Sequence, residues 1–167
     1  MARTTDPVLY ASANSRSAAK LPLGQRGGIA NTADDRVVMG QHRLGTLPVP
    51  STSFTSDPTF VHPGGEAELR YEFEREGLVI RAGLRFNEVR AFRFRSESHC
   101  TTWHVQDAYD TLVEVDPSDW AAELLSAEPS ESWGHWQIRH FLIFLDGSGA
   151  YEVAAASWSW LAEEPAQ

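Results

Sequence analysis

The stretch ELRYEFEREGLVIRAGLRF, residues 68–86, decides the fold because apolar side chains alternate in it with charged ones. Every second residue from Leu69 to Phe73 is apolar, and such alternation predicts a half-buried β-strand. Arg75-Glu76-Gly77 predicts a turn, after which a second strand places apolar residues inward at Leu78, Ile80, Ala82 and Leu84. Glutamates and arginines share the outward side of both strands, so cross-strand Glu–Arg pairing is expected there.

The alternation continues beyond this hairpin. Phe92 and Phe94 alternate with arginines and predict a third strand, so that three sequential strands favour an antiparallel meander. Two further apolar segments, residues 136–145 and 150–160, flank the turn sequence Asp-Gly-Ser-Gly at 146–149. This arrangement predicts a hairpin at the C-terminal end.

One short helix is expected between the strands. The sequence Asp116-Pro117-Ser118-Asp119 is typical of a helix start, with Asp116 as N-cap and proline at the first helical position. An apolar stripe follows at Trp120, Ala121, Leu124 and Leu125, and the helix is expected to end near Ser126. The predicted fold class is α+β: an antiparallel sheet of five or more strands with one short helix.

The first part of the chain has a different composition. Residues 1–65 hold six of the nine prolines and no sustained apolar period, which predicts a loop-rich N-terminal leader that is partly ordered at most. Phe54, Phe60 and Val61 are candidates for packing onto the domain. A single domain is predicted at residues 66–163, followed by a tail at 164–167.

The charge of the chain is strongly asymmetric. From Thr101 to Gln167 there are twelve acidic side chains and one basic one, and the whole chain has a net charge of −9. An acidic chain lacks the clustered cations that general nucleic-acid binding needs. No apolar run approaches the roughly 18 residues that cross a bilayer, and no secretory leader is evident. We therefore expect a cytoplasmic protein that binds neither nucleic acid nor membrane, with no prediction of its oligomeric state.

The acidic residues between Asp107 and Glu131 suggest a docking surface for a basic protein partner, because a long stretch without a compensating cation costs self-repulsion. A solvated face without a partner is the alternative. The predicted partner-binding residues are Asp107, Asp110, Glu114, Asp116, Asp119 and Glu123. These positions suit ionised carboxylates rather than the buried pair that general acid–base catalysis requires. No catalytic residue and no cofactor are predicted, and the leading hypothesis is a non-enzymatic protein-interaction module.

The loop after the third strand offers an alternative function. A thiolate and two imidazoles, from His99, Cys100 and His104, are ligand types that hold zinc, although their spacing fits no standard template. The alternative is thus a small metal-binding protein or a metal-dependent enzyme. Catalysis by a cysteine–histidine pair is disfavoured, because the acids downstream oppose a lowered thiol pKa.

Aromatic residues and one histidine complete the candidates. A third hypothesis is a small-ligand binder with a sheet lined by Trp103, Trp133 and Trp136. Trp158 and Trp160 are expected to pack in the core or at its rim. His140 shares its strand face with apolar residues, and we expect it to be a partly buried structural residue with a backbone or carboxylate partner.

Several short motifs carry a family resemblance. They are LxFxxVxxFRF at 84–94, AYDxLVEV at 108–115, SxW at 118–120, EL at 123–124, RHFxI at 139–143 and YEVxA at 151–155. With these motifs, residues 66–163 resemble small, uncharacterised bacterial proteins of the immunity type, which are encoded near polymorphic toxins. The resemblance implies a stoichiometric binder that neutralises a toxin, and it supplies no catalytic residues. An acidic surface would steer a basic, nuclease-like toxin toward such a binder.

Overall fold

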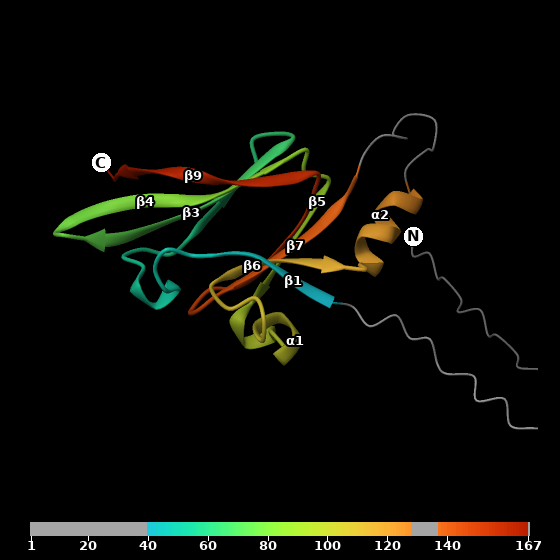
Figure 1. The fold of residues 1–167 in the computed structure, drawn as a ribbon, viewed down its shortest axis with the longest axis horizontal. Helices are drawn as coiled ribbons and strands as arrows, with labels where there is room; N and C mark the ends of the chain where they lie inside the picture. The colour runs from blue at the N-terminus through green and yellow to red at the C-terminus, as the bar shows by residue number, and fades with distance from the viewer. Residues whose placement is uncertain (1–39, 128–136, 167) are drawn as a thin grey trace, which may run out of the picture. The chain divides into compact units, whose positions relative to one another are not determined.

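The computed structural model describes residues 40–127 and 137–166, which form two antiparallel sheets (Figure 1). The five-stranded sheet has the order β1-β6-β7-β8-β5, and the four-stranded sheet has the order β2-β3-β4-β9. The strands are β1 (Gly40–Thr46), β2 (Thr59–Val61), β3 (Glu66–Arg75), β4 (Leu78–Asn87), β5 (Ala91–Ser96), β6 (Thr111–Asp116), β7 (Arg139–Leu145), β8 (Gly149–Ala155) and β9 (Ser157–Pro165). The described helices are α1 (Thr102–Val105), α2 (Asp119–Ala127) and two 3-10 turns at Ser51–Ser53 and Glu97–His99. The predicted class, antiparallel β-structure with few helices, is confirmed.

The predicted hairpin between β3 and β4 is confirmed, but Leu78, which was expected to face inward, is 62% exposed beside the turn. Arg75 pairs with Leu78 across a two-residue turn, and the turn residues Glu76 and Gly77 both have positive φ, as a tight hairpin turn requires. The apolar residues of β3 are buried. On the outward side, Glu68 lies opposite Arg85 and accepts two hydrogen bonds from its guanidinium at 2.7 and 3.0 Å. The expected cross-strand Glu–Arg pairing is therefore present.

The predicted meander is wrong, because β5 leaves the sheet of β3 and β4. β5 pairs with β8, and β9 takes the place beside β4. The segment predicted as one strand, residues 150–160, likewise breaks at Ala156, and its second half changes sheet. The two crossings are linked, since Ala156 N donates a hydrogen bond to Asn87 O at 3.1 Å. Alternation assigns each side chain to a face, but it does not choose the neighbouring strand.

Part of the predicted leader belongs to the sheets. Residues 40–61 supply β1 and β2, whereas residues 1–39 lie outside the described residues. The expected packing of Phe54 and Phe60 is confirmed: Phe54 stacks on Tyr71 at 4.6 Å between ring centroids, and the Phe60 ring lies 6.0 Å from that of Tyr151. At the other end, β9 continues to Pro165, two residues into the predicted tail.

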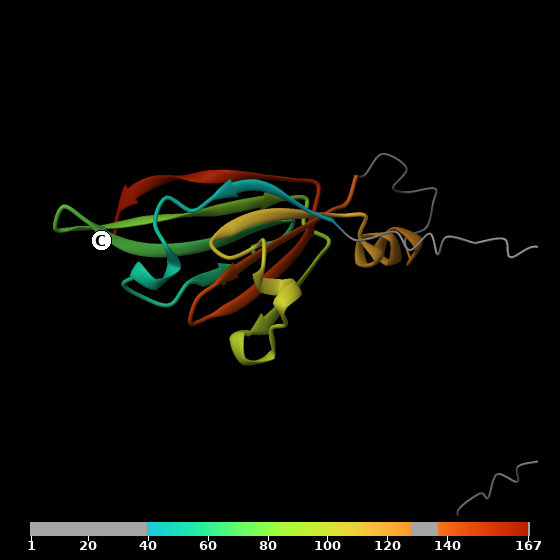
Figure 2. The same ribbon diagram turned by 60° about the horizontal axis from the view of Figure 1, so that its bottom comes forward.

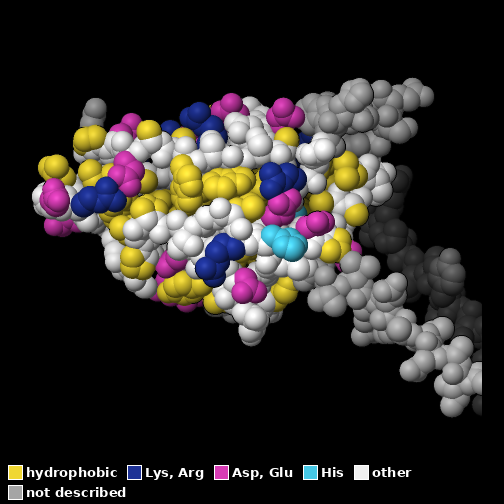
Figure 3. Space-filling view, viewed as in Figure 1, with side chains coloured by type: hydrophobic (Ala, Val, Ile, Leu, Met, Phe, Trp, Pro, Cys, Tyr) yellow, Lys and Arg dark blue, Asp and Glu magenta, His cyan; other side chains and the backbone are white. Residues whose placement is uncertain are grey.

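The two sheets pack face to face, as the tilted view shows (Figure 2). Their inward side chains form one core. In it, the ring of Phe86 from the four-stranded sheet packs on the ring of Phe141 from the five-stranded sheet, with 5.7 Å between the ring centroids. Where β1 and β9 meet, Trp158 and Trp160 close the space between the sheets. A side chain at Gly45 would lie only 2.9 Å from Trp160, so glycine permits this approach. Figure 3 shows a band of hydrophobic side chains on this face. The expected rim packing of both tryptophans is confirmed.

The two helices lie at opposite ends of β6 (Figure 1). α1 covers the outer face of the five-stranded sheet, where Trp103 and Val105 pack against a second apolar cluster. α2 begins two residues later than predicted: Ser118 Oγ accepts the Ala121 N–H at 3.1 Å, so Ser118 is the N-cap and Asp116 ends β6. No helix in the described part of the chain is long and apolar enough to cross a membrane.

Candidate functional site

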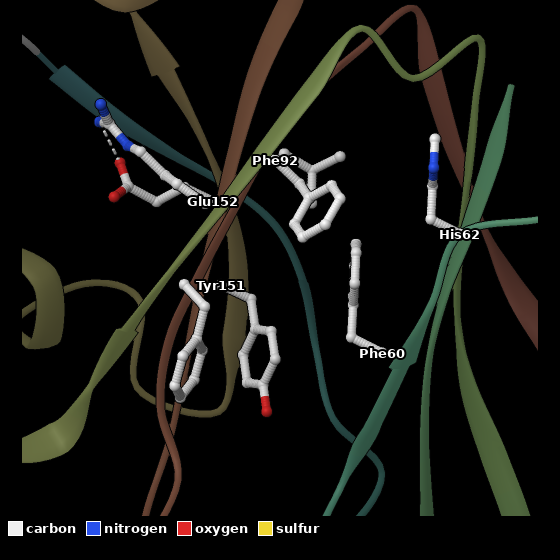
Figure 4. A pocket seen from close by; sticks show the side chains of 8 residues that line it. Phe60, His62, Phe92, Tyr151 and Glu152 are labelled. Carbon is white, nitrogen blue, oxygen red and sulfur yellow. Dashed lines mark hydrogen bonds and ion pairs between the residues drawn. The ribbon is translucent and has the colours of Figure 1, made fainter. Parts of the chain in front are cut away.

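A cleft opens between the sheets on the side formed by β2 and β5. Both are edge strands of their sheets, and the cleft between them has a volume of about 310 Å³. We call it the aromatic cleft and define it by Phe60, His62, Phe92, Phe94 and Tyr151. Figure 4 shows Phe60 from β2 pointing toward Phe92 of β5 and Tyr151 of β8. The cleft thus joins residues far apart in the sequence.

The rings of the aromatic cleft contact one another in pairs. Phe60 and Phe92 have their centroids 4.9 Å apart, as do Phe94 and Tyr151, and His62 lies 5.7 Å from Phe92. Tilted aromatic pairs at these separations are stabilising. Ser148 holds the Tyr151 hydroxyl by a hydrogen bond of 2.8 Å, which keeps the base of the cleft in place. The cleft is therefore a pre-formed apolar surface.

Two of these rings remain largely open to solvent. Phe92 is 50% exposed and Phe94 is 52% exposed. Single exposed apolar residues are ordinary, but a contiguous group beside a cleft is typical of a binding surface. Strand β5 is an edge strand that is exposed over nearly its whole length, and its two arginines are the kind of charged side chain with which natural edge strands discourage unspecific pairing.

The backbone of β5 offers hydrogen-bonding groups at the same place. Glu97 N donates a hydrogen bond to Ser148 O, so Glu97 directs its backbone groups toward β8. Arg93 and Arg95, which lie opposite Glu152 and Ala150 in the same ladder, therefore also direct their backbone groups toward β8. In an antiparallel ladder, successive residues direct their backbone groups to opposite sides. The N–H and C=O groups of Phe92 and Phe94 consequently point away from β8. No described strand pairs with that edge.

A buried ion network supports the cleft from the opposite face of the sheet. Glu152 is 1% exposed, accepts a hydrogen bond from Arg93 of β5, and lies 3.0 Å from His140 Nε2. Figure 4 shows its side chain on the opposite side of β8 from Tyr151. Burial opposes ionisation of Glu152, but the hydrogen bonds from His140 and Arg93 outweigh burial and lower the pKa of this carboxyl to about 2. The network attaches edge strand β5 to the sheet.

The same network reaches the start of α2. Ser118 Oγ lies 2.9 Å from His140 Nδ1 and already accepts the N–H of Ala121. The imidazole of His140 therefore bridges Ser118, through Nδ1, and Glu152, through Nε2. The Arg93 guanidinium lies over the Trp120 ring at 4.2 Å. The prediction that His140 is structural, with a carboxylate partner, is confirmed. Although serine, histidine and glutamate recur in hydrolases, this hydroxyl is occupied as a helix cap and the imidazole is buried.

Two of the six predicted partner-binding acids are engaged within the fold. Asp110 is 8% exposed and accepts the backbone N–H of Ser51 at 3.1 Å. Glu114 accepts a hydrogen bond of 2.7 Å from Arg139, and this contact lowers the pKa of the Glu114 carboxyl. Neither carboxylate faces solvent freely, so the predicted docking surface loses two members.

The other four acids are exposed but do not form one surface. Asp107 follows α1, whereas Asp116, Asp119 and Glu123 lie at α2. The six-residue strand β6 separates these two places by roughly 20 Å. We call the group of Asp116, Asp119 and Glu123 the α2 acidic surface. Glu131 belongs to residues 128–136, outside the described residues.

The alternative metal-ligand candidates have other contacts. His99 Nδ1 lies within hydrogen-bonding distance of two serine hydroxyls, and His104 Nδ1 accepts the N–H of Thr101 at 3.1 Å in a capping box at α1. Burial raises the pKa of the Cys100 thiol and lowers that of His104. Among the described residues, no group of three or more His, Cys, Asp or Glu side chains could hold a metal ion.

The tryptophan-lined ligand site is described only in part. Trp103 packs into the second core, whereas Trp133 and Trp136 lie outside the described residues. The aromatic cleft itself was not predicted. The only sign of the cleft in the sequence was the alternation of phenylalanine and arginine in β5. Phe60 and Tyr151 come to lie beside these phenylalanines only because β5 leaves the sheet of β3 and β4 and pairs with β8.

The resemblance to immunity-type proteins stays a prediction, and function is inferred from the aromatic cleft and its surroundings. Searches of protein-family models, of curated proteins and of solved structures found no match to the chain.

Proposed function

We propose that the protein is a non-enzymatic protein-interaction domain that binds its partner at the aromatic cleft. One observation carries this proposal: two half-exposed phenylalanines stand on β5, whose outer edge pairs with no described strand, at the mouth of an apolar cleft. Aromatic side chains dominate the energetic centres of protein interfaces, because they bury a large area with few rotatable bonds.

The lining of the cleft favours binding over catalysis. Its inward side chains are four aromatic rings, His62 and Val153, while the charged side chains of Arg93 and Glu152 are engaged on the opposite face. A volume of about 310 Å³ is at the small end for a drug-sized ligand and suits one or two side chains of a partner. A protein segment that inserts apolar side chains fits these dimensions.

A basic partner protein, such as the toxin implied by the family resemblance, is a second candidate with a different contact. It is favoured by the net charge of −9 and by the three exposed carboxylates of the α2 acidic surface. Reversing the charge at Asp119 and Glu123 would then slow association and remove its salt dependence. A cytoplasmic location belongs to the same proposal.

The test is a peptide-display selection against the full-length chain. Enriched peptides are re-measured on a Phe92→Ser/Phe94→Ser variant and on a Leu78→Ser variant, which removes an exposed apolar side chain at the β3–β4 turn, outside the cleft. We expect binding to weaken at least about ten-fold on the first variant and to persist on the second. Enriched peptides that bind both variants like the wild type would refute the proposal, as would a selection without enrichment.

A further inference from the structure

We propose that the partner contributes an extended segment that adds to β5 as a sixth strand of the five-stranded sheet. Its apolar side chains would enter the aromatic cleft, and acidic side chains would alternate with them opposite Arg93 and Arg95. This inference rests on the proposed function and names the chemistry of the segment that is bound.

The backbone of β5 is arranged for strand addition. The N–H and C=O groups of Phe92 and Phe94 point to the open edge, where an added antiparallel strand would bond to all of them. Peptide recognition by strand addition gains affinity from such main-chain bonds and specificity from alternate side chains. By contrast, the neighbouring edge strand β2 is only three residues long.

Side-chain positions on the added strand follow from the ladder. Residues opposite Phe92 and Phe94 share the inward face and would lie over the aromatic cleft, whereas residues opposite Arg93 and Arg95 share the outward face. The guanidinium of Arg95 makes no hydrogen bond or ion pair with any described residue, and its position on the strand is exposed. The side chain of Arg93 is 44% exposed although it contacts Glu152. Carboxylates on the partner would complement both.

The same charges disfavour a second copy of this chain as the occupant. Two β5 strands paired antiparallel must keep their phenylalanines on one face. The two such registers nearest the centre of the strand each place an arginine opposite an arginine: Arg93 opposite Arg93, or Arg93 opposite Arg95. Like charges directly opposite destabilise a sheet. A foreign segment with alternating acidic and apolar residues avoids this repulsion.

The probe is the peptide acetyl-Gly-Glu-Tyr-Glu-Val-Glu-Gly-amide, titrated into full-length, isotope-labelled protein at about 0.15 M ionic strength. Two matched peptides serve as controls: one replaces each glutamate by lysine, and the other is N-methylated at tyrosine and valine. These two residues would pair with Phe92 and Phe94, so methylation removes the donors without changing the charge. Amide shifts in the protein spectrum give the affinity and the place of binding.

We expect the glutamate peptide to shift the Phe92 and Phe94 amides and to bind about ten-fold more tightly than either control. An Arg95→Glu variant should bind the lysine peptide better than the glutamate peptide. Equal binding of the glutamate and N-methylated peptides would overturn strand addition, and no preference for glutamate over lysine would overturn the acidic chemistry. Failure of this peptide series, with display-selected peptides still lost on the Phe92→Ser/Phe94→Ser variant, would overturn the inference and leave the proposed function standing.

Discussion

The Glu152→Gln substitution tests whether a buried carboxylate holds the edge strand β5 in place. Its two hydrogen-bonding partners lower the pKa of Glu152 from an ordinary value of 4.5 to about 2, and one pKa unit corresponds to about 1.4 kcal/mol. Because the folded state has the lower pKa, the ionised carboxylate stabilises the fold above pH 4.5, and this contribution declines as the pH falls toward 2. The contacts of the Glu152 carboxylate with His140 and Arg93 together contribute about 3 kcal/mol to the free energy of unfolding at neutral pH.

The assay is urea unfolding of the wild type and of Glu152→Gln over a series of pH values. Their difference in unfolding free energy should be about 3 kcal/mol near neutral pH and should approach zero near pH 2. Glu74→Gln is the control, since Glu74 lies exposed on β3 and its carboxylate makes no hydrogen bond or ion pair with any described residue. A difference that does not change with pH would refute the electrostatic reasoning, because lost packing has no such pH dependence.

Three further outcomes follow from the structure. Leu84→Ala should lower the free energy of unfolding by about 2–5 kcal/mol, because Leu84 is fully buried between the sheets, and a loss below about 1 kcal/mol in urea would contradict that placement. Ser118→Ala should cost about 1–2 kcal/mol and speed amide exchange in α2, since it removes both the helix cap and the hydroxyl that contacts His140; unchanged exchange would rule out the cap. Cys100 should react with a disulfide reagent more slowly near neutral pH than the thiol of an unstructured peptide, because burial raises its pKa, and an equal or faster rate would show that the thiol is not buried.

The strands with strong alternation could be predicted from the sequence. In β3, apolar and charged residues each keep to one face, and both hairpin turns contain glycines at positive φ: Gly77 in the first, and Gly147 and Gly149 in the second. These signals are local, because they depend on side-chain period and on turn chemistry.

The partner of each strand could not be predicted in this way. β5 and β9 exchange neighbours through bends at residues 87–90 and at Ala156, and no period in the sequence encodes that exchange. β2 escaped prediction because it is only three residues long, and β1 because its sequence GQHRLGT has no apolar alternation. Their place depends on tertiary contacts such as the stacking of Phe54 on Tyr71.

For the candidate site too, residue types could be recognised from the sequence, whereas contacts between distant residues could not. A count of charges along the chain treats Asp110 and Glu114 as surface acids, but the fold supplies each with a partner, Ser51 and Arg139, that is distant in sequence. The aromatic cleft depends on the meeting of β2 with β5, which only the three-dimensional arrangement reveals.

The most direct test compares the two candidate surfaces in one binding series. The dissociation constant of the tightest display-selected peptide is measured on the wild type, on Phe92→Ser/Phe94→Ser, and on Asp116→Asn/Asp119→Asn/Glu123→Gln, with folding of each checked by circular dichroism. Binding at the aromatic cleft predicts at least about a ten-fold loss on the first variant and none on the second. A loss confined to the second variant would contradict the central claim and place the partner at the α2 acidic surface.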